Sequence, residues 1–264
     1  MDPAIRIRGV HKVFAGGGGE VVALGGIDLD VDPGELVCLL GPSGCGKSTL
    51  LNAIAGFSPP TSGSVLANGR PVTAPGPDRA MVFQEYALFP WLTVARNVAF
   101  GLEVRGEAPE RTRDRVDALL SRLSLRDFRD RFPKDLSGGM RQRVAIARVL
   151  AIDPPMLLMD EPFGALDALT RRDLQDELLR IWAELSKTIV FVTHGIEESL
   201  YLADRVVVMT YRPGTVKRIV PVTLARPRDP ASPEFNLLKK QVTELVMEEQ
   251  RLHEADERGG TAER

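Results

Sequence analysis

The sequence is poor in cysteine, in long apolar runs and in net charge, and each shortage excludes a class of protein. Only two cysteines occur, Cys38 and Cys45, which are too few and wrongly spaced for a disulfide framework or a zinc site. No apolar run approaches the roughly 18 residues that span a bilayer, and residues 1–10 lack the apolar core of a signal peptide. We therefore expect free thiols in a soluble, cytoplasmic protein.

The formal net charge of the 264 residues is −2, which gives no general reason to expect nucleic-acid binding. Hydrophobic residues make up 44% and charged residues 27% of the chain, an ordinary balance for a globular protein. The length allows one large domain or two small ones. Composition leaves the function open, so local patterns have to identify it.

A glycine-rich loop at residues 41–49, "GPSGCGKST", fits the phosphate-loop pattern G-x-x-x-x-G-K-[ST]. A buried strand is predicted before it and a helix after it, so a chance match of a glycine-rich turn is the weaker interpretation. In such a loop backbone N–H groups surround phosphates, Lys47 meets the β- and γ-phosphates, and Ser48 ligates Mg²⁺. Thr49 would add a hydroxyl near the α-phosphate. The candidate nucleotide-binding residues of this loop are Gly41, Pro42, Ser43, Gly44, Cys45, Gly46, Lys47, Ser48 and Thr49.

A second candidate phosphate site, at Ser137, Gly138 and Gly139, precedes a predicted helix that is rich in arginine. The first N–H groups of a helix lack intrahelical partners, and the helix macrodipole is positive there. Two such helix starts lie far apart in one chain. Any functional interpretation has to explain why both are present.

Two carboxylates, Asp160 and Glu161, stand at the end of the predicted buried strand 156–160. A carboxylate at this position is costly unless it serves a cation, and phosphate-loop NTPases use an aspartate here to hold Mg²⁺. Glu161 would orient or deprotonate the attacking water. The alternative for Glu161 is a solvated loop acid.

Two polar residues follow neighbouring predicted strands: Gln84 after 80–83 and His194 after 188–193. Ligands gather at the carboxyl ends of parallel strands, so we expect both residues at the edge that carries the phosphate loop. Gln84 would contact Mg²⁺ or the attacking water, and His194 would hydrogen-bond the γ-phosphate. A histidine considered alone is more often structural.

Continuous apolar strands alternate with helices through 206–209, whereas strand 27–32 alternates apolar and acidic residues. The pattern predicts an α/β fold of the P-loop NTPase type. Its parts would be a mostly parallel, helix-covered sheet, an N-terminal antiparallel β subdomain and an inserted α-helical signature subdomain. We expect an ATPase domain over residues 1–225, with the helical subdomain at 84–150, and a linker and amphipathic helix over 226–264.

Taken in order, these motifs resemble those of the nucleotide-binding subunit of ATP-binding cassette (ABC) transporters, over roughly residues 4–220. The resemblance implies that ATP and Mg²⁺ are the cofactors and that ATP hydrolysis is the activity. The family's signature matches residues 136–140, its glutamine loop matches Gln84, and its switch histidine matches His194. Its loop "GALD" matches residues 164–167, which makes Asp167 a nucleotide-binding candidate.

Two positions depart from the family's pattern. Met140 stands where the signature usually ends in glutamine, and Gly195 stands where aspartate commonly follows the switch histidine. Ser137, Gly138 and Gly139 are retained, so the anion-binding backbone should survive. We expect neither departure to abolish turnover.

The resemblance also implies a head-to-tail homodimer, in which Ser137, Gly138 and Gly139 of one subunit complete the ATP site of the other. This arrangement would explain the two helix starts. It further implies that adenine stacks on an aromatic residue near the N-terminus, a position that Phe14 matches, with Val22 packed beside the ring. Plain core packing is the alternative for Phe14.

Within the family, "LFPWLTVARNVAFGL" and "RPGTVKRIVPVTLARPRDPASPEF" look like segments of importers for nitrate, sulfonates and taurine. Such importers imply integral membrane permease subunits, a periplasmic or lipid-anchored substrate-binding protein and a peripheral location on the cytoplasmic face of the inner (plasma) membrane, with no nucleic-acid partner. Importers of bicarbonate or a pyrimidine precursor are alternatives, as are soluble ABC ATPases of translation or DNA repair. The apolar residues that follow Gln84 are Leu88, Phe89, Trp91 and Leu92. They would either line a groove that receives the permease or fill the core of the helical subdomain itself.

The tail is predicted to form one amphipathic helix. Its apolar face is interrupted by Glu249 and includes Leu238, Val242, Leu245 and Leu252. The stripe is too short for a coiled coil. We expect the helix to pack on its own domain or on its dimer mate.

Overall fold

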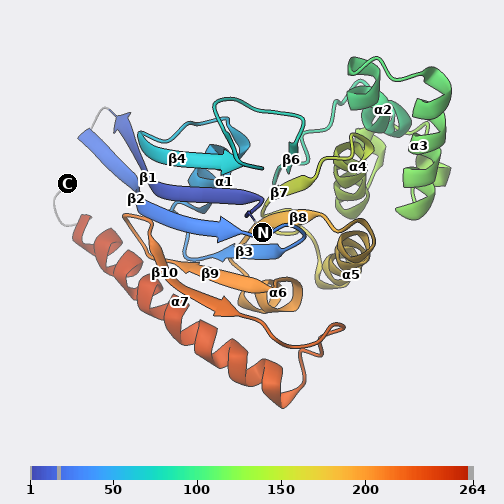
Figure 1. Ribbon diagram of the computed structural model, residues 1–264. Helices are drawn as coiled ribbons and strands as arrows, with labels where there is room; N and C mark the ends of the chain where they lie inside the picture. Colours follow the sequence, from blue (N-terminus) through green and yellow to red (C-terminus); the bar gives the residue numbers. More distant parts are fainter. Residues whose placement is uncertain (1, 17–18, 261–264) are drawn as a thin grey trace. The chain divides into compact units, whose positions relative to one another are not determined.

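The computed structural model describes residues 2–16 and 19–260 (Figure 1). Its residue contacts divide the chain into two compact units, Met1–Gly76 together with Thr188–Arg264 (unit 1) and Pro77–Lys187 (unit 2). Among the helices of the described residues, none has both the length and the apolar character needed to cross a membrane.

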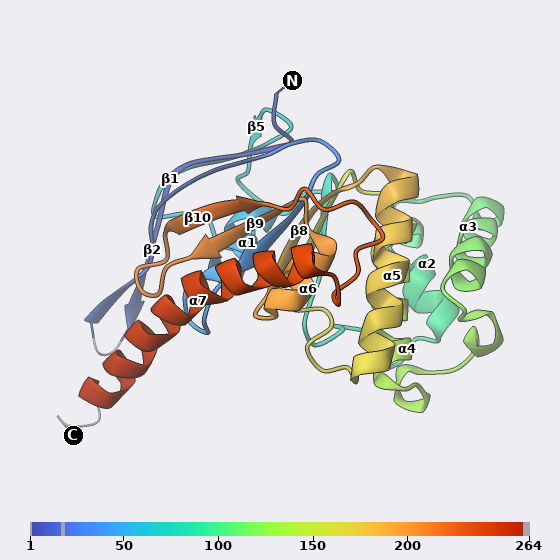
Figure 2. The same cartoon turned by 90° about the horizontal axis from the view of Figure 1, so that it is seen from below.

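Unit 1 begins with an antiparallel sheet of strand order β2-β1-β4-β5 (Figure 1, with β5 labelled in Figure 2). Its strands are β1 (Ile5–Gly16), β2 (Gly19–Val31), β4 (Ser62–Ala67) and β5 (Arg70–Pro71). Asn68 and Gly69 form the turn between β4 and β5 with positive φ angles of 48° and 75°, the geometry that Asn-Gly favours. The predicted N-terminal antiparallel β layer is confirmed.

A second sheet in unit 1 is mostly parallel and leads into the phosphate loop. β3 (Leu36–Leu40) pairs in parallel with β8 (Thr188–Thr193) on one side and with β9 (Arg205–Met209) on the other, and β10 (Val216–Pro221) pairs antiparallel with β9. Every residue of β3 and β8 is buried, as expected for strands covered on both faces. The carboxyl ends of β3 and β8 are followed by α1 (Lys47–Ala55) and α6 (Ile196–Leu202).

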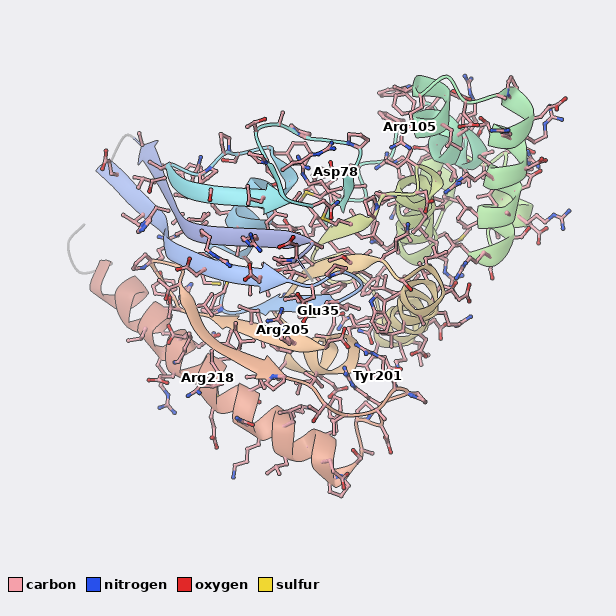
Figure 3. All side chains as sticks on the ribbon, in the orientation of Figure 1. Glu35, Asp78, Arg105, Tyr201, Arg205 and Arg218 are labelled. Atoms are coloured by element: carbon pink, nitrogen blue, oxygen red, sulfur yellow. The ribbon has the colours of Figure 1, made fainter. Side chains whose placement is uncertain are left out.

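An ion pair fixes the turn that precedes β3 (Figure 3). The Arg205 guanidinium, at the start of β9, binds both carboxylate oxygens of Glu35 and donates to the carbonyl oxygen of Asp30 at 2.7 Å. The hydrogen bond with Glu35 raises the pKa of Arg205. This arginine therefore ties together the end of β2, the entry to β3 and the start of β9.

The C-terminal helix α7 (Pro233–Gly260) runs beside β9 and β10 and contacts α6 (Figure 2). Its buried face includes Phe235, Val242 and Val246, so the helix packs on its own subunit. Leu252, expected on this face, is 56% exposed, whereas Glu249 is buried. Toward the C-terminal end of this face Leu252 is thus exposed, while the buried position belongs to Glu249, which has polar partners.

The segment before α7 is fastened by a buried arginine. Burial lowers the pKa of Arg228 to about 10, so the guanidinium is still charged at neutral pH. Its N–H groups donate over 2.7–3.2 Å to the carbonyl oxygens of Leu200, Tyr201, Ala203, Val222 and Leu224. Arg228 therefore satisfies carbonyl groups at the end of α6 that would otherwise be buried without donors.

Unit 2 combines two parallel strands with packed helices (Figure 1). β6 (Arg79–Val82) pairs in parallel with β7 (Met156–Asp160). The segment between these strands forms α2 (Val94–Val104), α3 (Pro109–Arg122), short 3₁₀ turns at Arg126–Phe128 and Pro133–Asp135, and α4 (Gly138–Ala151). The helices α2, α3 and α4 contact one another, and α5 (Ala168–Leu185) packs on α4.

Candidate functional site

The phosphate loop connects the end of β3 to the first turn of α1 in unit 1. Gly44 and Gly46 have positive φ angles of 76° and 93°, which glycine adopts without the steric cost of a Cβ. A Cβ on Gly46 would lie 2.7 Å from Leu24 Cδ2 and 2.9 Å from the Ala23 carbonyl oxygen. Backbone conformation and close packing both require glycine at residue 46.

Lys47 lies inside this loop, and its ammonium donates to the carbonyl oxygens of Gly41 and Pro42 at 2.8 and 2.9 Å. The residue is only 6% exposed. Cys45 Sγ lies 3.8 Å from the same nitrogen, and burial raises the pKa of that thiol. The loop thus surrounds one positive charge with neutral groups. That charge and the N–H groups at the start of α1 can together attract phosphate.

Hydroxyl groups occupy the first turn of α1, where Ser48 is exposed and Thr49 is half-buried. Hydroxyl oxygens are donors that Mg²⁺ accepts beside phosphate oxygens. The other expected donors, the carboxylate of Asp160 and the amide of Gln84, are also oxygens. The chemistry of this donor set fits Mg²⁺ better than a metal that prefers sulfur or imidazole.

His194 follows β8 at the edge of the sheet that carries the phosphate loop. The parallel register pairs the last residues of β3 and β8, so Gly41 and His194 are the next residues beyond the two strands. The Thr193 hydroxyl donates to the Glu198 carboxylate at 2.5 Å, which ties the strand end to α6. The expected common edge is confirmed, while the role of His194 is a matter for experiment.

Phe14 and Val22, the residues expected to contact adenine, lie on the β1–β2 hairpin with exposed side chains. The Lys12 ammonium lies 5.1 Å from the centre of the Phe14 ring. The register pairs Phe14 with Val21 and Val22 with Val13, and directly opposed residues share a face of a sheet. Val21 is therefore the cross-strand neighbour of the ring. The register shift between Lys12 and Val13 places Val22 opposite Val13 instead, and a contact of Val22 with adenine stays a prediction.

In unit 2, β7 ends at Asp160, which is half-buried after four buried residues. Glu161 has a φ angle of 43°, a strained conformation for a residue with a side chain. Its carbonyl oxygen accepts the Gly164 N–H at 3.2 Å and closes a turn. The second carboxylate thus stands in a strained turn directly after the strand, a feature that clusters at functional sites.

Gln84 lies two residues beyond β6 and is exposed. The parallel register pairs Val82 with Met159, so Gln84 and Asp160 leave the two strands at the same edge. Gln84 therefore follows its strand at the carboxyl-end edge, as expected, and that edge also carries Asp160; the expectation that Gln84 lies at the phosphate-loop edge stays a prediction.

Ser137 caps the N-terminus of α4, and its Oγ accepts the Met140 N–H at 3.3 Å. Gly138 and Gly139 occupy the first two helical positions, where N–H groups have no intrahelical partners. A Cβ on Gly139 would lie 2.4 Å from Thr170 Cγ2, so a side chain at residue 139 would require Thr170 to move. The helix start expected from the signature is present. Close packing against Thr170 is an additional reason for glycine at residue 139.

Asp167 caps the neighbouring helix α5, and its carboxylate accepts the Thr170 N–H at 3.0 Å. Hydrogen bonding with Thr170 lowers the pKa of Asp167. The cap gives this aspartate a structural role. Nucleotide binding by Asp167 stays a prediction from the resemblance.

The sequence alone did not reveal two residues that join the glutamine loop to α4. The Arg148 guanidinium donates to the carbonyl oxygens of Ala87 at 2.6 Å and Tyr86 at 3.3 Å. The Tyr86 hydroxyl lies close to Gly138, where an added Cβ would be 3.2 Å from it. Tyr86 and Ala87 both have positive φ angles, of 52° and 47°. No local pattern predicts two adjacent residues in this strained conformation.

An apolar patch follows the glutamine loop in unit 2. The Phe89 ring lies 5.7 Å from Trp91 and 4.5 Å from Phe100, centre to centre, and Trp91 is 70% exposed. The loop is held from inside by Asn97, which is fully buried and donates at 3.0–3.1 Å to the carbonyl oxygens of Phe89, Leu92 and Thr93. Of the four residues expected in a groove or in the core, Trp91 is therefore exposed, and Leu88, Phe89 and Leu92 are half-buried.

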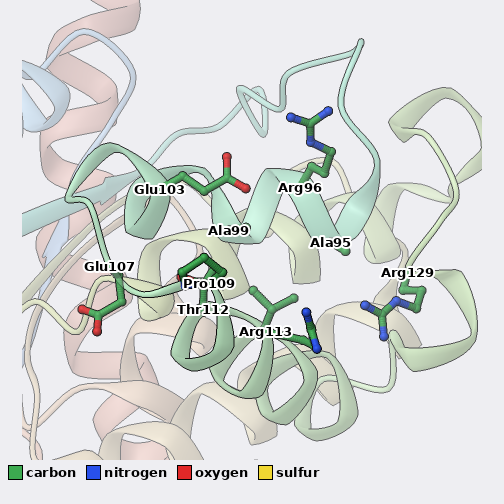
Figure 4. A pocket seen from close by; sticks show the side chains of 10 residues that line it. Ala95, Arg96, Ala99, Glu103, Glu107, Pro109, Thr112, Arg113 and Arg129 are labelled. Atoms are coloured by element: carbon green, nitrogen blue, oxygen red, sulfur yellow. The ribbon is translucent and has the colours of Figure 1, made fainter.

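A hollow of about 280 Å³ lies between α2 and α3 in the same unit (Figure 4). Its wall combines the apolar side chains of Ala99 and Val116 with the charged side chains of Arg96 and Glu103. Thr112 also lines it, and the buried hydroxyl of this threonine has no hydrogen-bond partner. The hollow can therefore accept a short segment that supplies both apolar and polar groups.

Comparison with known proteins identifies relatives of this architecture. The family model described as ABC transporter matches residues 24–164. The nitrate import ATP-binding protein NrtD of Synechocystis sp. is 47% identical over 235 residues, covering 89% of this chain and 88% of that protein. The aliphatic sulfonates import ATP-binding protein SsuB of Bacillus subtilis is 45% identical over 239 residues, covering 90% and 92%.

A solved structure extends the likeness to the fold. It is a dimeric, post-hydrolysis state of an ATP-binding cassette bound to ADP and Pi, with a TM-score of 0.75 and 33% identity, covering 84% of this chain and all of that chain. The predicted fold class is confirmed.

Proposed function

This chain belongs to the ABC transporter family and is an ATP-binding ATPase, and we propose that it powers import of a small anionic solute of the sulfonate, taurine or nitrate type. The solute class is supported by the likeness to relatives named for nitrate and aliphatic sulfonate import. The strongest support for an ATPase that works as a pair of subunits is the presence of two helix starts suited to phosphate in one chain. One is the start of α1, where the preceding loop surrounds the Lys47 ammonium. The other is the start of α4, which Ser137 caps. A single subunit with a single nucleotide needs only one of them.

The residues of the phosphate loop bind the ATP phosphates in this proposal. Lys47 supplies positive charge to the β- and γ-phosphates, and the loop N–H groups fix the phosphate chain. Mg²⁺, when bound, neutralises developing charge on the phosphate oxygens, and its protein ligands are Ser48, Gln84 and Asp160. Phe14 stacks on the adenine, with Val21 rather than Val22 as its cross-strand neighbour.

Glu161 orients and deprotonates the attacking water, Gln84 contacts that water or the metal, and His194 donates a hydrogen bond to the γ-phosphate. These roles come from the family resemblance. The strained backbone at Glu161 supports its role, because strain of this kind clusters at active sites.

Two copies of the chain associate head to tail around two ATP molecules. The N–H groups at Gly138 and Gly139 and the Ser137 hydroxyl of one copy meet the γ-phosphate bound by its mate. Asp167 lies at the adjoining start of α5 and acts at the same contact. Hydrolysis removes the γ-phosphate that joins the copies, so association and release follow the nucleotide cycle.

The partner on which association and release of the two copies act is an integral membrane permease. Its cytoplasmic loop docks on the aromatic patch of Phe89, Trp91 and Phe100 and on the hollow between α2 and α3. The chain thus works as a peripheral subunit on the cytoplasmic face of the inner membrane, and a periplasmic or lipid-anchored binding protein delivers the solute. Residues 1–225 act as the ATPase domain, with its helical part at 84–150, and 226–264 are an appended segment.

The solute class is tested by reconstituting the chain in liposomes with a permease and a binding protein of this importer type. Taurine, an alkanesulfonate or nitrate should stimulate ATP hydrolysis when the binding protein is present. Stimulation by bicarbonate or a pyrimidine precursor alone would assign the transporter to another solute. An absence of ATP hydrolysis in every mixture would contradict the ATPase assignment itself.

A further inference from the structure

A buried carboxylate of α7 holds the hairpin at residues 210–215. Glu249 is 5% exposed, and its Oε2 accepts the Tyr211 N–H at 2.7 Å while its Oε1 accepts the Lys217 ammonium at 2.6 Å. The Tyr211 ring also lies 4.7 Å from the His253 ring, one helical turn further along α7. Two positions of α7 therefore set the place of Tyr211.

The same hairpin touches the phosphate loop. Arg212 follows Tyr211, is exposed and donates from its Nε to the Gly44 carbonyl oxygen at 3.4 Å. Gly214 is packed so closely that a Cβ there would lie 2.1 Å from the Cys45 carbonyl oxygen. The hairpin thus contacts two successive residues of the loop.

The contact at Gly44 bears on how the loop presents its N–H groups. The C=O and N–H of a trans peptide point in opposite directions. A donor on the Gly44 carbonyl therefore holds the following N–H, that of Cys45, toward the interior of the loop, where it makes a long 3.4 Å contact with the Pro42 carbonyl oxygen. Phosphate binding by such a loop requires N–H groups with that orientation.

On the side of α7, the hairpin is contacted at a small number of the described residues. A hollow of about 510 Å³ separates much of the hairpin from α7 and is lined by Arg212, Pro213 and Leu252, among others. The hairpin is also held by β2, because the Gly214 N–H donates to the Ala23 carbonyl oxygen at 3.0 Å and the Gly25 N–H donates to the Gly214 carbonyl oxygen at 2.9 Å. On the side of α7, Glu249 and His253 hold it at Tyr211, next to Arg212. A change at residue 249 should therefore act first on Tyr211 and on the adjoining Arg212.

We propose that α7 positions the phosphate loop through this hairpin, with Glu249 as the anchor and Arg212 as the positioning residue for the Gly44–Cys45 peptide. The ligand concerned is the phosphate chain of ATP or ADP, so the inference rests on the proposed nucleotide binding. Arg212 acts through the loop and takes no part in bond breaking. Its loss should weaken nucleotide binding and leave the rate of the chemical step unchanged.

The first test measures the affinity of the full-length protein for a fluorescent ADP analogue. Arg212→Ala should raise Kd about fivefold, the effect of losing one charge-assisted hydrogen bond, and raise KM for ATP with kcat unchanged. Arg212→Lys keeps a donor and should restore the affinity to within about twofold. The matched control Arg218→Ala removes an exposed arginine of β10 (Figure 3) and should have no effect. Equal Kd values for Arg212→Ala and the wild type would overturn the proposal.

The second test asks whether α7 acts through Arg212. Glu249→Ala should raise Kd by a similar factor, whereas Glu248→Ala, which removes a neighbouring carboxylate that binds Lys217 but not Tyr211, should not. The Arg212→Ala/Glu249→Ala double variant should have a Kd no higher than that of the single variant with the higher Kd. Additive losses would contradict transmission through the hairpin. Thermal melting checks folding, and the exposed Arg212 variants carry the test if Glu249→Ala unfolds.

The two proposals fail differently. If wild-type protein binds no nucleotide, or if Lys47→Ala binds it as well as wild type, the proposed function is wrong. If Lys47→Ala abolishes binding while Arg212→Ala leaves it unchanged, the function stands and this inference is wrong.

Discussion

Gly139 at the start of α4 packs so closely on Thr170 of α5 that a Cβ at residue 139 would lie 2.4 Å from the threonine Cγ2. Two helix N-termini therefore meet within unit 2, one capped by Ser137 and the other by Asp167. Their positive ends are brought to one place, which favours an anion there. The second glycine of the signature is thus needed for packing as well as for access to phosphate.

Replacing that glycine should cost stability. We expect Gly139→Ala to lower the free energy of unfolding by about 2 kcal/mol, because the new methyl group must displace the short Thr170 side chain, which has little room to move. Gly138→Ala is the comparison, since the nearest group to its Cβ would be the Tyr86 hydroxyl at 3.2 Å, the end of a side chain that can move. Urea unfolding measures both, and equal losses would contradict the packing argument.

Glu161→Gln should bind ATP normally but hydrolyse it slowly, because the amide cannot accept a proton from water. The dimer joined by ATP should then accumulate, and light scattering with saturating Mg-ATP should report twice the subunit mass. Glu85→Gln is the control, since it removes an exposed carboxylate next to Gln84. A Glu161→Gln protein that stays monomeric under these conditions would rule out the ATP-bound dimer.

Mixing two inactive variants tests whether the signature acts on the partner's ATP. Ser137→Arg should bind nucleotide but not hydrolyse it, and Lys47→Ala should bind it poorly. In a head-to-tail heterodimer one of the two sites combines an intact phosphate loop with an intact signature. ATPase activity should therefore appear on mixing. If each signature served its own subunit, no intact site would form and the mixture would stay inactive.

Arg228→Ala should lower the free energy of unfolding by about 3 kcal/mol, because it leaves several buried carbonyl groups without donors. The reference variant is Arg218→Ala, an exposed arginine whose loss should change stability by less than about 0.5 kcal/mol. Urea midpoints at neutral pH compare the two. A small effect at Arg228 would mean that water replaces the guanidinium at these carbonyls.

Stability at low pH should depend in part on Asp153. Its hydrogen bond with Lys187, 2.7 Å long, lowers the pKa of the carboxyl group in the folded state. The stabilisation is therefore present above about pH 4, the ordinary aspartate pKa, and is lost as the pH falls through the lowered value. The pair is partly exposed, so we expect less than about 1 kcal/mol.

Asp153→Asn should remove that pH dependence while tolerating the positive φ angle of 51° at this residue. Unfolding curves of wild type and variant should differ at pH 7 and converge near pH 2. A constant difference across this range would exclude the ion pair as its cause.

The phosphate loop, the carboxylates after β7 and the capped start of α4 could be predicted from the sequence because each is local. A buried strand, a glycine-rich turn and a helix follow one another at residues 36–55, and Ser137 caps the helix that begins next to it. Short-range backbone geometry decides such features. The common edge of Leu40 and Thr193 also followed from the rule for parallel strands.

Tertiary structure alone decided the features whose partners come from distant parts of the chain. Glu249 interrupts an apolar stripe in the sequence, yet it is buried because Lys217 and the Tyr211 N–H reach it. A register shift at Lys12 makes Val21, not Val22, the neighbour of Phe14. The cost of burying a charge, or the face that a strand residue takes, depends on groups that the local sequence does not contain.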